Sequence, residues 1–479
     1  MTDSRNPSAN NGNGRYDLIV VGAGSAGFSA AITAAEQGAQ VALVGHGTIG
    51  GTCVNFGCVP SKTLIRATEA VHHANIASTR FDGIESGARV TDWAAQVAQK
   101  DALVASLRQA KYADLLSEYN NVAYHEGRAR LVEGGVDVGA RLLASERIII
   151  ATGARPALPS IPGIGEVSPL DSTMALALTE LPRSLIVMGG GYVGAELAQT
   201  FARAGVAVTL VFRSRLLPEA EPEIGQALAD YLTDEGVTIV RGVTYDFVRK
   251  TDDGGVALAI TRNGGLEVLT AEQILVATGR TPNTQGLGLS EAGVAQTSSG
   301  AVVIDDRMGT SKAGVYAAGD VTGKDQFVYM AAYGAKLAAR NALNGNSLRY
   351  DNTVMPAVVF TDPQVASVGV TEAQARAAGH AVRTSVLSLD NVPRALAARD
   401  TRGLIKLVAD GATRKLLGAH ILSPEGADSI QTAALAIRCG LSIDDLAEMI
   451  FPYLTTVEGL KLAAQTFDRD VKKLSCCAG

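Results

Sequence analysis

The sequence predicts an α/β protein with two nucleotide-binding units on parallel sheets and a C-terminal α+β domain. The main observation is an internal repeat, since residues 18–44 and 185–211 align without a gap and share 13 of 27 positions. Each copy reads as an apolar strand, a glycine turn, a helix of small residues and a second apolar strand, as in parallel α/β sheets. From about residue 353, alternating strands such as MPAVVF and LIKLV precede helices, which indicates a separate α+β domain.

Length and charge narrow the class of protein. The 479 residues correspond to roughly three domains at about 150 residues each. The 42 Lys and Arg residues against 48 Asp and Glu residues give a net charge of -6, which disfavours nucleic acid as a partner. No apolar run approaches the roughly 20 residues of a membrane span. The polar first 14 residues lack the apolar core of a secretory signal. We therefore expect a cytoplasmic protein without membrane insertion.

In the first copy, Gly22, Gly24 and Gly27 follow the strand and open the helix. This Rossmann-like spacing permits a tight turn, close approach of the backbone to a pyrophosphate, and helix–strand packing. The helix N-terminus adds amide donors for the phosphates. The alternative is a purely structural turn. One residue departs from the pattern, because Gly45 stands where the second strand usually ends in a ribose-binding acid.

The second copy repeats the phosphate motif at Gly189, Gly191 and Gly194. Phe212 occupies the position of the acid, and Arg213 and Arg215 follow it. An acid would favour NADH, whereas basic residues favour the 2′-phosphate of NADPH. We therefore predict NADPH, with two solvated surface arginines as the alternative.

Other segments connect these units. The segments 147–156 and 273–283 both place Ala-Thr-Gly after an apolar strand, where we expect the chain to cross between domains. A further strand ends in a glycine turn at 315–323. A long amphipathic helix is expected over about 91–120, with the only tryptophan, Trp93.

Two cysteines lie close together in GGTCVNFGCVPSK, residues 50–62. Cys53 and Cys58 flank the start of a predicted helix, whose N-terminus favours the thiolate. Two thiols at this spacing can close a disulfide that a neighbouring flavin reduces. The alternative is a structural pair in a turn. Cys439, on an apolar helix, is expected to be a packed core thiol.

Together these motifs resemble the pyridine nucleotide–disulfide oxidoreductases, the family of glutathione reductase and dihydrolipoamide dehydrogenase. The resemblance implies FAD in the first unit, NAD(P)H in the second, and a redox-active disulfide between Cys53 and Cys58, with Cys58 beside the flavin ring. It implies that Lys62 lies near the flavin N5 and pairs with Glu196. Tyr192 would cover the empty nicotinamide pocket, unless it merely packs on its helix.

The resemblance also assigns cofactor contacts. Asp320 would bind the ribityl chain of FAD, with a turn-capping aspartate as the alternative. The implied FAD contacts are Gly22, Gly24, Gly27, Gly51, Thr52, Thr152, Gly153, Gly319 and Asp320. The implied NADPH contacts are Gly189, Gly191, Gly194, Arg213, Arg215 and Gly279.

Two features near the C-terminus indicate a branch of the family. Counting back five residues from Glu458 gives Tyr453, where disulfide reductases carry an acid–base histidine. A phenol with a pKa near 10 is a poor base at neutral pH. The chain also carries Cys476 and Cys477 near its end, and soft thiolates select soft metals. The alternative for this pair is an oxidisable tail without function.

With GGTCVNFGCVPSK, these features resemble the mercuric reductases, a branch of the family. The resemblance implies Hg(II) thiolate complexes as substrate and reduction to Hg(0). It implies a homodimer with composite sites, in which Cys476 and Cys477 of one subunit pass the metal to Cys53 and Cys58 of the other. Two departures are an absent N-terminal CxxC metal-binding domain and the absence of a tyrosine in residues 161–176.

Two other functions remain open at this point: an NAD(P)H-dependent disulfide reductase and a non-catalytic thiol carrier of metal. The expected domain organisation is a disordered tail over 1–14, an FAD-binding domain over 15–154 continued by 283–352, an NADPH-binding domain over 155–282, and a dimerisation domain over 353–479.

Overall fold

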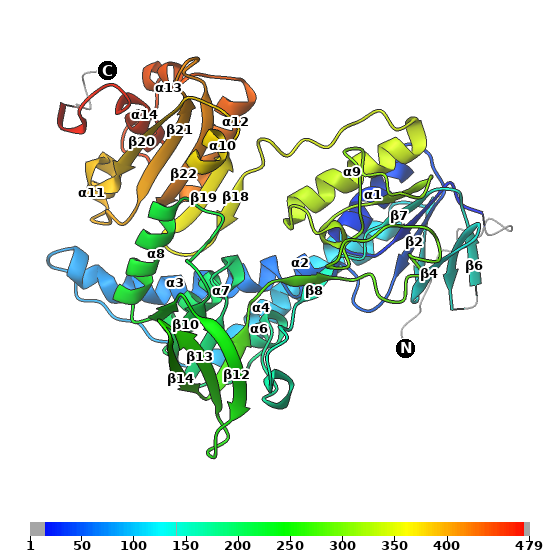
Figure 1. Ribbon diagram of the computed structural model, residues 1–479, viewed down its shortest axis with the longest axis horizontal. Helices are drawn as coiled ribbons and strands as arrows, with labels where there is room; N and C mark the ends of the chain where they lie inside the picture. Colours follow the sequence, from blue (N-terminus) through cyan, green and yellow to red (C-terminus); the bar gives the residue numbers. More distant parts are fainter. Residues whose placement is uncertain (1–14, 140, 474–479) are drawn as a thin grey trace. The chain divides into compact units, whose positions relative to one another are not determined.

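The computed structural model describes residues 15–139 and 141–473, which form two compact units (Figure 1). Unit 1 contains the described residues of Met1–Ser61, Val97–Ala157 and Gly279–Asp351. Unit 2 contains those of Lys62–Gln96, Leu158–Thr278 and Asn352–Gly479. Within the described ranges, none of the helices has the length and apolar character needed to cross a membrane.

Unit 1 is built on a parallel sheet of five strands in the order β17-β7-β1-β2-β3. The strands are β1 (Leu18–Val21), β2 (Val41–Gly45), β3 (Val122–Glu126), β7 (Ile148–Ile150) and β17 (Val315–Ala317). The central strand LIVV is buried at every position. A parallel sheet covered on both faces requires such continuous apolar runs.

Two layers cover this sheet. Helices α1 (Ser25–Ala35) and α9 (Val328–Asn344) lie side by side and pack on the face that carries Leu18 and Val20 (Figure 1). The antiparallel strands β4 (Ala129–Val132), β5 (Gly135–Val138) and β6 (Arg141–Ala144) pack on the opposite face against Ile19 and Val21.

The two Ala-Thr-Gly segments meet beside this sheet. Strand β8 (Ala154–Pro156) pairs antiparallel with β16 (Arg280–Pro282). Thr152 Oγ1 donates to the Asn283 carbonyl at 2.7 Å, and Asn283 Nδ2 donates to the Thr152 carbonyl at 3.0 Å. The chain therefore leaves unit 1 after Ala157 and re-enters it at Gly279 beside one short ribbon.

The first part of unit 2 repeats the plan of unit 1. The parallel sheet has the order β11-β10-β9-β15, and a three-stranded antiparallel sheet covers one face. Helix α7 (Tyr192–Arg203) follows β9 as α1 follows β1. The strands are β9 (Ser184–Met188), β10 (Ala207–Phe212), β11 (Thr238–Arg241), β15 (Gln273–Val276), β12 (Thr244–Lys250), β13 (Val256–Arg262) and β14 (Gly265–Ala271).

The second part of unit 2 is an antiparallel sheet in the order β18-β19-β22-β21-β20 with helices on one face. Its strands are β18 (Ala357–Val359), β19 (Gln364–Gly369), β20 (Val382–Ser388), β21 (Leu404–Asp410) and β22 (Leu416–Ser423). The helices on that face are α11 (Pro393–Ala397), α12 (Gly426–Arg438), α13 (Ile443–Glu448) and α14 (Glu458–Gln465), whereas Glu372 of α10 (Glu372–Ala377) pairs with Lys406 on the other face. The predicted α/β fold with a C-terminal α+β domain is confirmed.

The predicted helix over 91–120 is only partly right. It consists of α4 (Trp93–Arg108), a π-helical turn at Gln109–Ala113, and α5 (Asp114–Ser117). The turn carries Tyr112, whose ring packs edge-on against Phe28 of α1 with centroids 4.8 Å apart. A π-turn changes the face a helix presents, which apolar periodicity does not reveal.

The expectation of a buried Cys439 is wrong. Helix α12 buries Ile430, Ala433 and Ala436 against its own sheet, but it ends at Arg438, and Cys439 is exposed at its C-cap. The remaining helices are α2 (Gly51–Asn55), α3 (Cys58–Arg80), α6 (Ser172–Leu176) and α8 (Pro222–Asp234).

A buried charge network ties the two parts of unit 2 together. Asp362 accepts from Arg203 of α7 at 3.0 Å and from Arg402 at 3.2 Å, and lies 2.9 Å from His73 Nε2. Burial alone would raise the pKa of Asp362, but the His73 hydrogen bond and both guanidinium groups hold it well below its ordinary value. The ionised carboxylate is therefore the form that stabilises this junction.

We predict that Asp362→Asn lowers the stability of unit 2 by about 3 kcal/mol at pH 7, because it removes one of the two carboxylates that Arg203 and Arg402 share and leaves only Glu235 between them. A carboxyl group whose folded pKa lies below its unfolded value of about 3.9 adds stability above that pH and loses it as the pH falls. The wild-type protein should therefore lose stability more steeply than Asp362→Asn between about pH 5 and pH 3.

Trp93 provides the measurement, because its Nε1 donates to the Leu178 carbonyl at 2.9 Å and its ring packs near Phe201, all within unit 2. Urea unfolding followed by Trp93 fluorescence at several pH values would test the prediction. Asp252→Asn, at an exposed turn, is the control. Parallel pH curves for wild type and Asp362→Asn would contradict it.

Candidate active site

The first glycine loop joins β1 to α1 through close backbone contacts. A Cβ at Gly22 would lie 2.2 Å from the Ala151 carbonyl oxygen, and one at Gly27 would lie 1.7 Å from the Gly22 oxygen. Gly24 is the N-cap of α1 and has no side chain that caps the helix. Glycine at the N-cap offers no side-chain acceptor to the first backbone amides of α1. A pyrophosphate site needs these amides to be available to the phosphates.

A second glycine segment lies against this loop. A Cβ at Gly51, the first residue of α2, would lie 2.5 Å from the Gly24 Cα. Gly319 follows β17, and a Cβ there would lie 3.2 Å from the Cβ atoms of Ala26 and Ala331. The loop, the start of α2 and the AAGD turn therefore converge in unit 1, with glycine where their backbones come closest, as expected at the site of a dinucleotide such as FAD.

Asp320, in the AAGD turn, faces Arg280. The carboxylate lies 3.3 Å from Arg280 Nε, and burial raises the pKa of Asp320 although the guanidinium opposes this. Arg280 also donates to the Ala154 carbonyl. Sequence analysis did not single out Arg280, because its contact with Asp320 spans 40 residues and no spacing rule relates the two.

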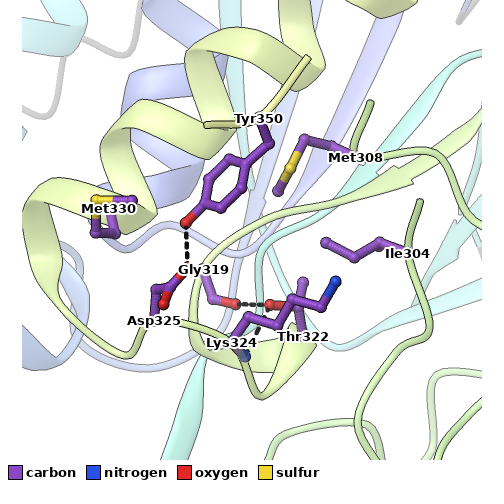
Figure 2. A pocket seen from close by; sticks show the side chains of 8 residues that line it. All are labelled: Ile304, Met308, Gly319, Thr322, Lys324, Asp325, Met330 and Tyr350. Atoms are coloured by element: carbon purple, nitrogen blue, oxygen red, sulfur yellow. Dashed lines mark hydrogen bonds between the residues drawn. The ribbon is translucent and has the colours of Figure 1, made fainter. Parts of the chain in front are cut away.

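Hydrogen bonds stabilise the AAGD turn and the residues that follow it (Figure 2). Thr322 Oγ1 donates to the Gly319 carbonyl at 2.9 Å, and Tyr350 Oη donates to Asp325 at 2.9 Å. Burial and the Asp325 carboxylate raise the pKa of Tyr350, so its hydroxyl remains a donor. The small hollow between these groups is lined mostly by apolar and internally bonded side chains, including Ile304, Met308 and Met330.

The second glycine loop has the geometry of the first. A Cβ at Gly189 would lie 2.3 Å from the Ala277 carbonyl oxygen, and one at Gly194 would lie 1.9 Å from the Gly189 oxygen. Gly191 is the N-cap of α7, and no atom lies within 4 Å of where its Cβ would be. The open space in front of Gly191 fits the phosphates of a second dinucleotide.

The residues after β10 differ in their availability. Phe212 is buried, and its ring fills the space a Cβ at Gly190 would take, at 2.8 Å. Arg213 is exposed, and among the described residues it makes no ion pair. Arg215 is half-buried and donates to the Pro218 carbonyl. Arg213 is therefore the better placed of the two for an anionic ligand.

The cysteine pair is held by a side-chain clamp. Cys53 lies in α2 and is half-buried, and Cys58 is the exposed first residue of α3. Asn55 Nδ2 donates to the carbonyls of Ile49 and Gly51 at 2.9 and 2.8 Å, and its Oδ1 accepts from Arg108 at 3.1 Å. This clamp fixes the short helix that carries Cys53, and spacing alone did not reveal it.

Tyr112 of the π-helical turn is a further residue of this region that sequence analysis missed. Its hydroxyl lies 3.3 Å from Ser25 Oγ. Burial raises its pKa, and the charges of Cys53 and Cys58 raise it further, although the Ser25 hydrogen bond opposes this. A neutral phenol therefore lies within electrostatic range of both thiols.

Lys62 and Glu196 form an ion pair in unit 2 at 2.6 Å. The buried Glu196 also accepts from the Phe360 amide at 2.9 Å, and Lys62 Nζ lies 4.8 Å from the centre of the Phe360 ring. Both contacts hold the Lys62 ammonium group in a fixed position within unit 2. Tyr192 begins α7, and burial and then Glu219 raise the pKa of its phenol.

Tyr453 and Glu458 bound a strained turn. Glu458 is buried and accepts from the Leu454 amide at 3.1 Å, and Leu454 has a φ of 58°. Burial raises the pKa of Glu458. Tyr453 is 54% exposed, so its ring is not part of this core. Cys476 and Cys477 lie outside the described residues.

Comparisons with known proteins bear on this geometry. Residues 16–339 match the family model "pyridine nucleotide-disulphide oxidoreductase", and residues 355–464 match its dimerisation domain. A mercuric reductase of Lysinibacillus sphaericus is 48% identical over 466 residues, which cover 97% of this chain and 85% of the relative. One of Streptomyces lividans is 47% identical over 97% of this chain and 98% of the relative.

Solved structures give the same picture. The copper(II) complex of the HOCl-induced flavoprotein disulfide reductase RclA of Escherichia coli matches with a TM-score of 0.83 and 30% identity. The match covers 94% of this chain and 99% of that structure. A further structure of RclA from Escherichia coli matches with a TM-score of 0.82 and 31% identity.

We predict that the glycines of the second loop respond differently to alanine. Gly191→Ala should preserve the thermal unfolding midpoint, because its methyl group contacts no other atom of the protein. It should weaken binding of NADP⁺ and NAD⁺ at least tenfold, because the methyl group enters the space where the phosphates would bind. Gly194→Ala should lower the midpoint, because its methyl group meets the Gly189 carbonyl at 1.9 Å. Calorimetric titration and thermal scans measure both effects. Unchanged nucleotide binding by Gly191→Ala would refute the assignment.

Proposed function

Because the chain belongs to the pyridine nucleotide-disulphide oxidoreductase family and is an FAD-dependent oxidoreductase, we propose that it reduces Hg(II) to Hg(0) with NADPH. The observation that carries this proposal is Tyr453, since a phenol stands where the disulfide-reducing relatives need an acid–base histidine. Relatives 41–48% identical over nearly the whole chain that are named mercuric reductases support it.

Cys53 and Cys58 are the proposed metal-binding dithiol of the active site. Cys58 begins α3, and a helix N-terminus lowers the pKa of a thiol and favours the thiolate. Two adjacent thiolates bind a soft cation such as Hg(II) strongly. The Asn55 clamp keeps α2, and with it Cys53, in a fixed position.

FAD, when bound, supplies the two-electron relay between the nicotinamide and this dithiol. In unit 1, the proposed FAD contacts are the first glycine loop, Gly51, Thr52, Thr152, Gly153, Gly319 and Asp320. In unit 2, Glu196 holds the Lys62 ammonium in place at 2.6 Å, and we propose that this fixes a positive charge beside the flavin. Tyr192, at the start of α7, would cover the nicotinamide pocket.

The proposed reaction needs no proton donor at position 453. A Hg(II) ion held by two thiolates accepts two electrons and leaves as Hg(0), whereas reduction of a disulfide substrate releases a thiolate that must be protonated. Glu458 accepts from the Leu454 amide, so it stabilises the turn beside Tyr453. A phenol at position 453 is therefore compatible with metal reduction and poorly suited to disulfide reduction.

The match to a dimerisation domain over 355–464 supports a homodimer. We propose composite sites, in which Cys476 and Cys477 of one subunit capture Hg(II) and transfer it to Cys53 and Cys58 of the other by thiolate exchange. We also propose the division into an FAD-binding domain (15–154 and 283–352), an NADPH-binding domain (155–282) and a dimerisation domain (353–479). The cytoplasmic location remains a prediction.

The direct test is NADPH consumption by the FAD-loaded enzyme with thiol-buffered Hg(II), with volatile mercury measured in parallel. Turnover that releases one Hg(0) per NADPH would support the proposal. Faster NADPH oxidation with oxidised glutathione or lipoamide would instead identify a disulfide reductase. Stoichiometric binding of Hg(II) without turnover would identify a thiol carrier.

We predict that Arg213→Ala lowers the preference for NADPH over NADH by roughly 10- to 150-fold, because a charge-assisted contact with the 2′-phosphate contributes about 1.5–3 kcal/mol. Arg215→Ala is the matched comparison. It should have a smaller effect, because Arg215 is already bonded to the Pro218 carbonyl. The ratio of kcat/KM values for the two nucleotides measures both, and an unchanged ratio in Arg213→Ala would contradict the assignment.

We predict that changing both Cys476 and Cys477 to Ala slows Hg(II) turnover but leaves hydride transfer from NADPH to the flavin unchanged, since the tail lies on the metal route only. Stopped-flow absorbance separates the two rates. A mixed dimer tests the route across the interface. Pairing a tail-deficient subunit with one that lacks Cys53 and Cys58 should retain about half the wild-type activity, because one composite site survives.

The reverse pattern would overturn transfer between subunits. In that case the mixed dimer would be inactive, and a dimer of one wild-type and one doubly defective subunit would be active, because each tail would serve its own subunit.

A further inference from the structure

Gly45 ends β2, where dinucleotide-binding sheets usually carry the acid that binds a ribose hydroxyl. The backbone at Gly45 has no positive φ, so the local conformation does not require glycine. Steric contacts with neighbouring side chains do require glycine at this position. A Cβ at this position would lie 2.5 Å from Tyr124 Oη and 2.7 Å from the Ala23 Cβ. Position 45 therefore has no room for a carboxylate side chain while Tyr124 is in place.

Tyr124 reaches this place from the neighbouring strand. It lies on β3, which pairs in parallel with β2, and its register partner is Leu43. Leu43 and Tyr124 face the α1 side of the sheet, the side to which a Cβ at Gly45 would also point. The hydroxyl consequently lies between the end of β2 and Ala23 of the first glycine loop, where the missing carboxylate would begin.

The chemistry of the hydroxyl suits a ribose. Burial raises the pKa of Tyr124, and the Glu126 carboxylate raises it further, so the phenol stays protonated. Throughout the described ranges no side chain or backbone group hydrogen-bonds to this hydroxyl. A half-buried phenol whose hydroxyl is unused can either donate a hydrogen bond to a ribose hydroxyl or accept one from it.

We propose that Tyr124 replaces the absent acid at position 45 and binds a ribose hydroxyl of the adenosine part of FAD. The inference rests on FAD binding in unit 1 and is independent of the substrate that the enzyme reduces. A neutral hydrogen bond replaces a charge-assisted one, so the ribose contact contributes less to FAD affinity than a carboxylate would.

A competition experiment on the full-length holoenzyme tests this without measuring activity. The enzyme is equilibrated with equal amounts of FAD and of FAD analogues that carry 2′-deoxyadenosine or 3′-deoxyadenosine, and the bound flavins are separated by chromatography. The wild-type enzyme should prefer FAD over one of the analogues by about two- to tenfold. Tyr124→Phe should bind FAD and that analogue equally.

Tyr16→Phe is the control, because the Tyr16 hydroxyl lies 2.9 Å from Nε2 of His125, whose side chain follows Tyr124 on β3. It should keep the wild-type preference. The same preference in Tyr124→Phe as in wild type would overturn the inference and leave the flavin assignment intact. Failure of the wild-type enzyme to bind FAD at all would overturn both.

The steric part of the argument has its own test. Gly45→Glu alone should lower the FAD content and the thermal midpoint of the purified enzyme, because the new side chain meets Tyr124. Gly45→Glu combined with Tyr124→Val should recover part of the lost FAD content, since the new side chain then meets only the Ala23 methyl group. Gly45→Glu with unchanged FAD content and midpoint would show that the two side chains do not compete, and would overturn the inference.

Discussion

Both nucleotide-binding sheets depend on the approach of a glycine to the carbonyl group that follows a neighbouring strand. The first glycine of each loop faces such an oxygen, Ala151 in unit 1 and Ala277 in unit 2, at distances that exclude any Cβ. The third glycine then packs on the carbonyl of the first. These contacts place the start of α1 and α7 at the carboxyl ends of the strands. In unit 1, the start of α1 in turn sets the positions of Gly51, Gly319 and the turn that carries Cys53 and Cys58.

The same constraint explains how much of the fold is readable from the sequence. Only glycine tolerates these contacts, so the loop spacing recurs in both copies of the repeat, and buried parallel strands such as LIVV are apolar at every position. Where packing was less constrained, prediction failed. The sequence did not predict the π-helical turn around Tyr112, whose ring packs on Phe28. It also did not predict that α12 ends one residue before Cys439 and leaves this residue exposed.

The cysteine pair and the Lys62–Glu196 partnership were predictable from motifs, but the groups that hold the site were not. Asn55 accepts a hydrogen bond from Arg108, which lies 53 residues away, and Asp320 forms an ion pair with Arg280. Asp362 depends on Arg203 and Arg402, which come from different elements. Such pairs join residues that lie far apart in the sequence, so no local pattern in a single sequence records them.

Two positions, Gly45 and Tyr453, depart from the family pattern, and they differ in what takes the place of the missing side chain. At Gly45 the lost side chain coincides with a gained one, since Tyr124 fills the place from the next strand. At Tyr453 a phenol stands in place of the acid–base histidine, and Glu458 accepts from the Leu454 amide in the same turn. A compensated loss preserves a function that the molecule still needs. The loss of the histidine at position 453 agrees with the proposed reaction, because the transfer of two electrons to a thiolate-bound metal needs no proton at this position.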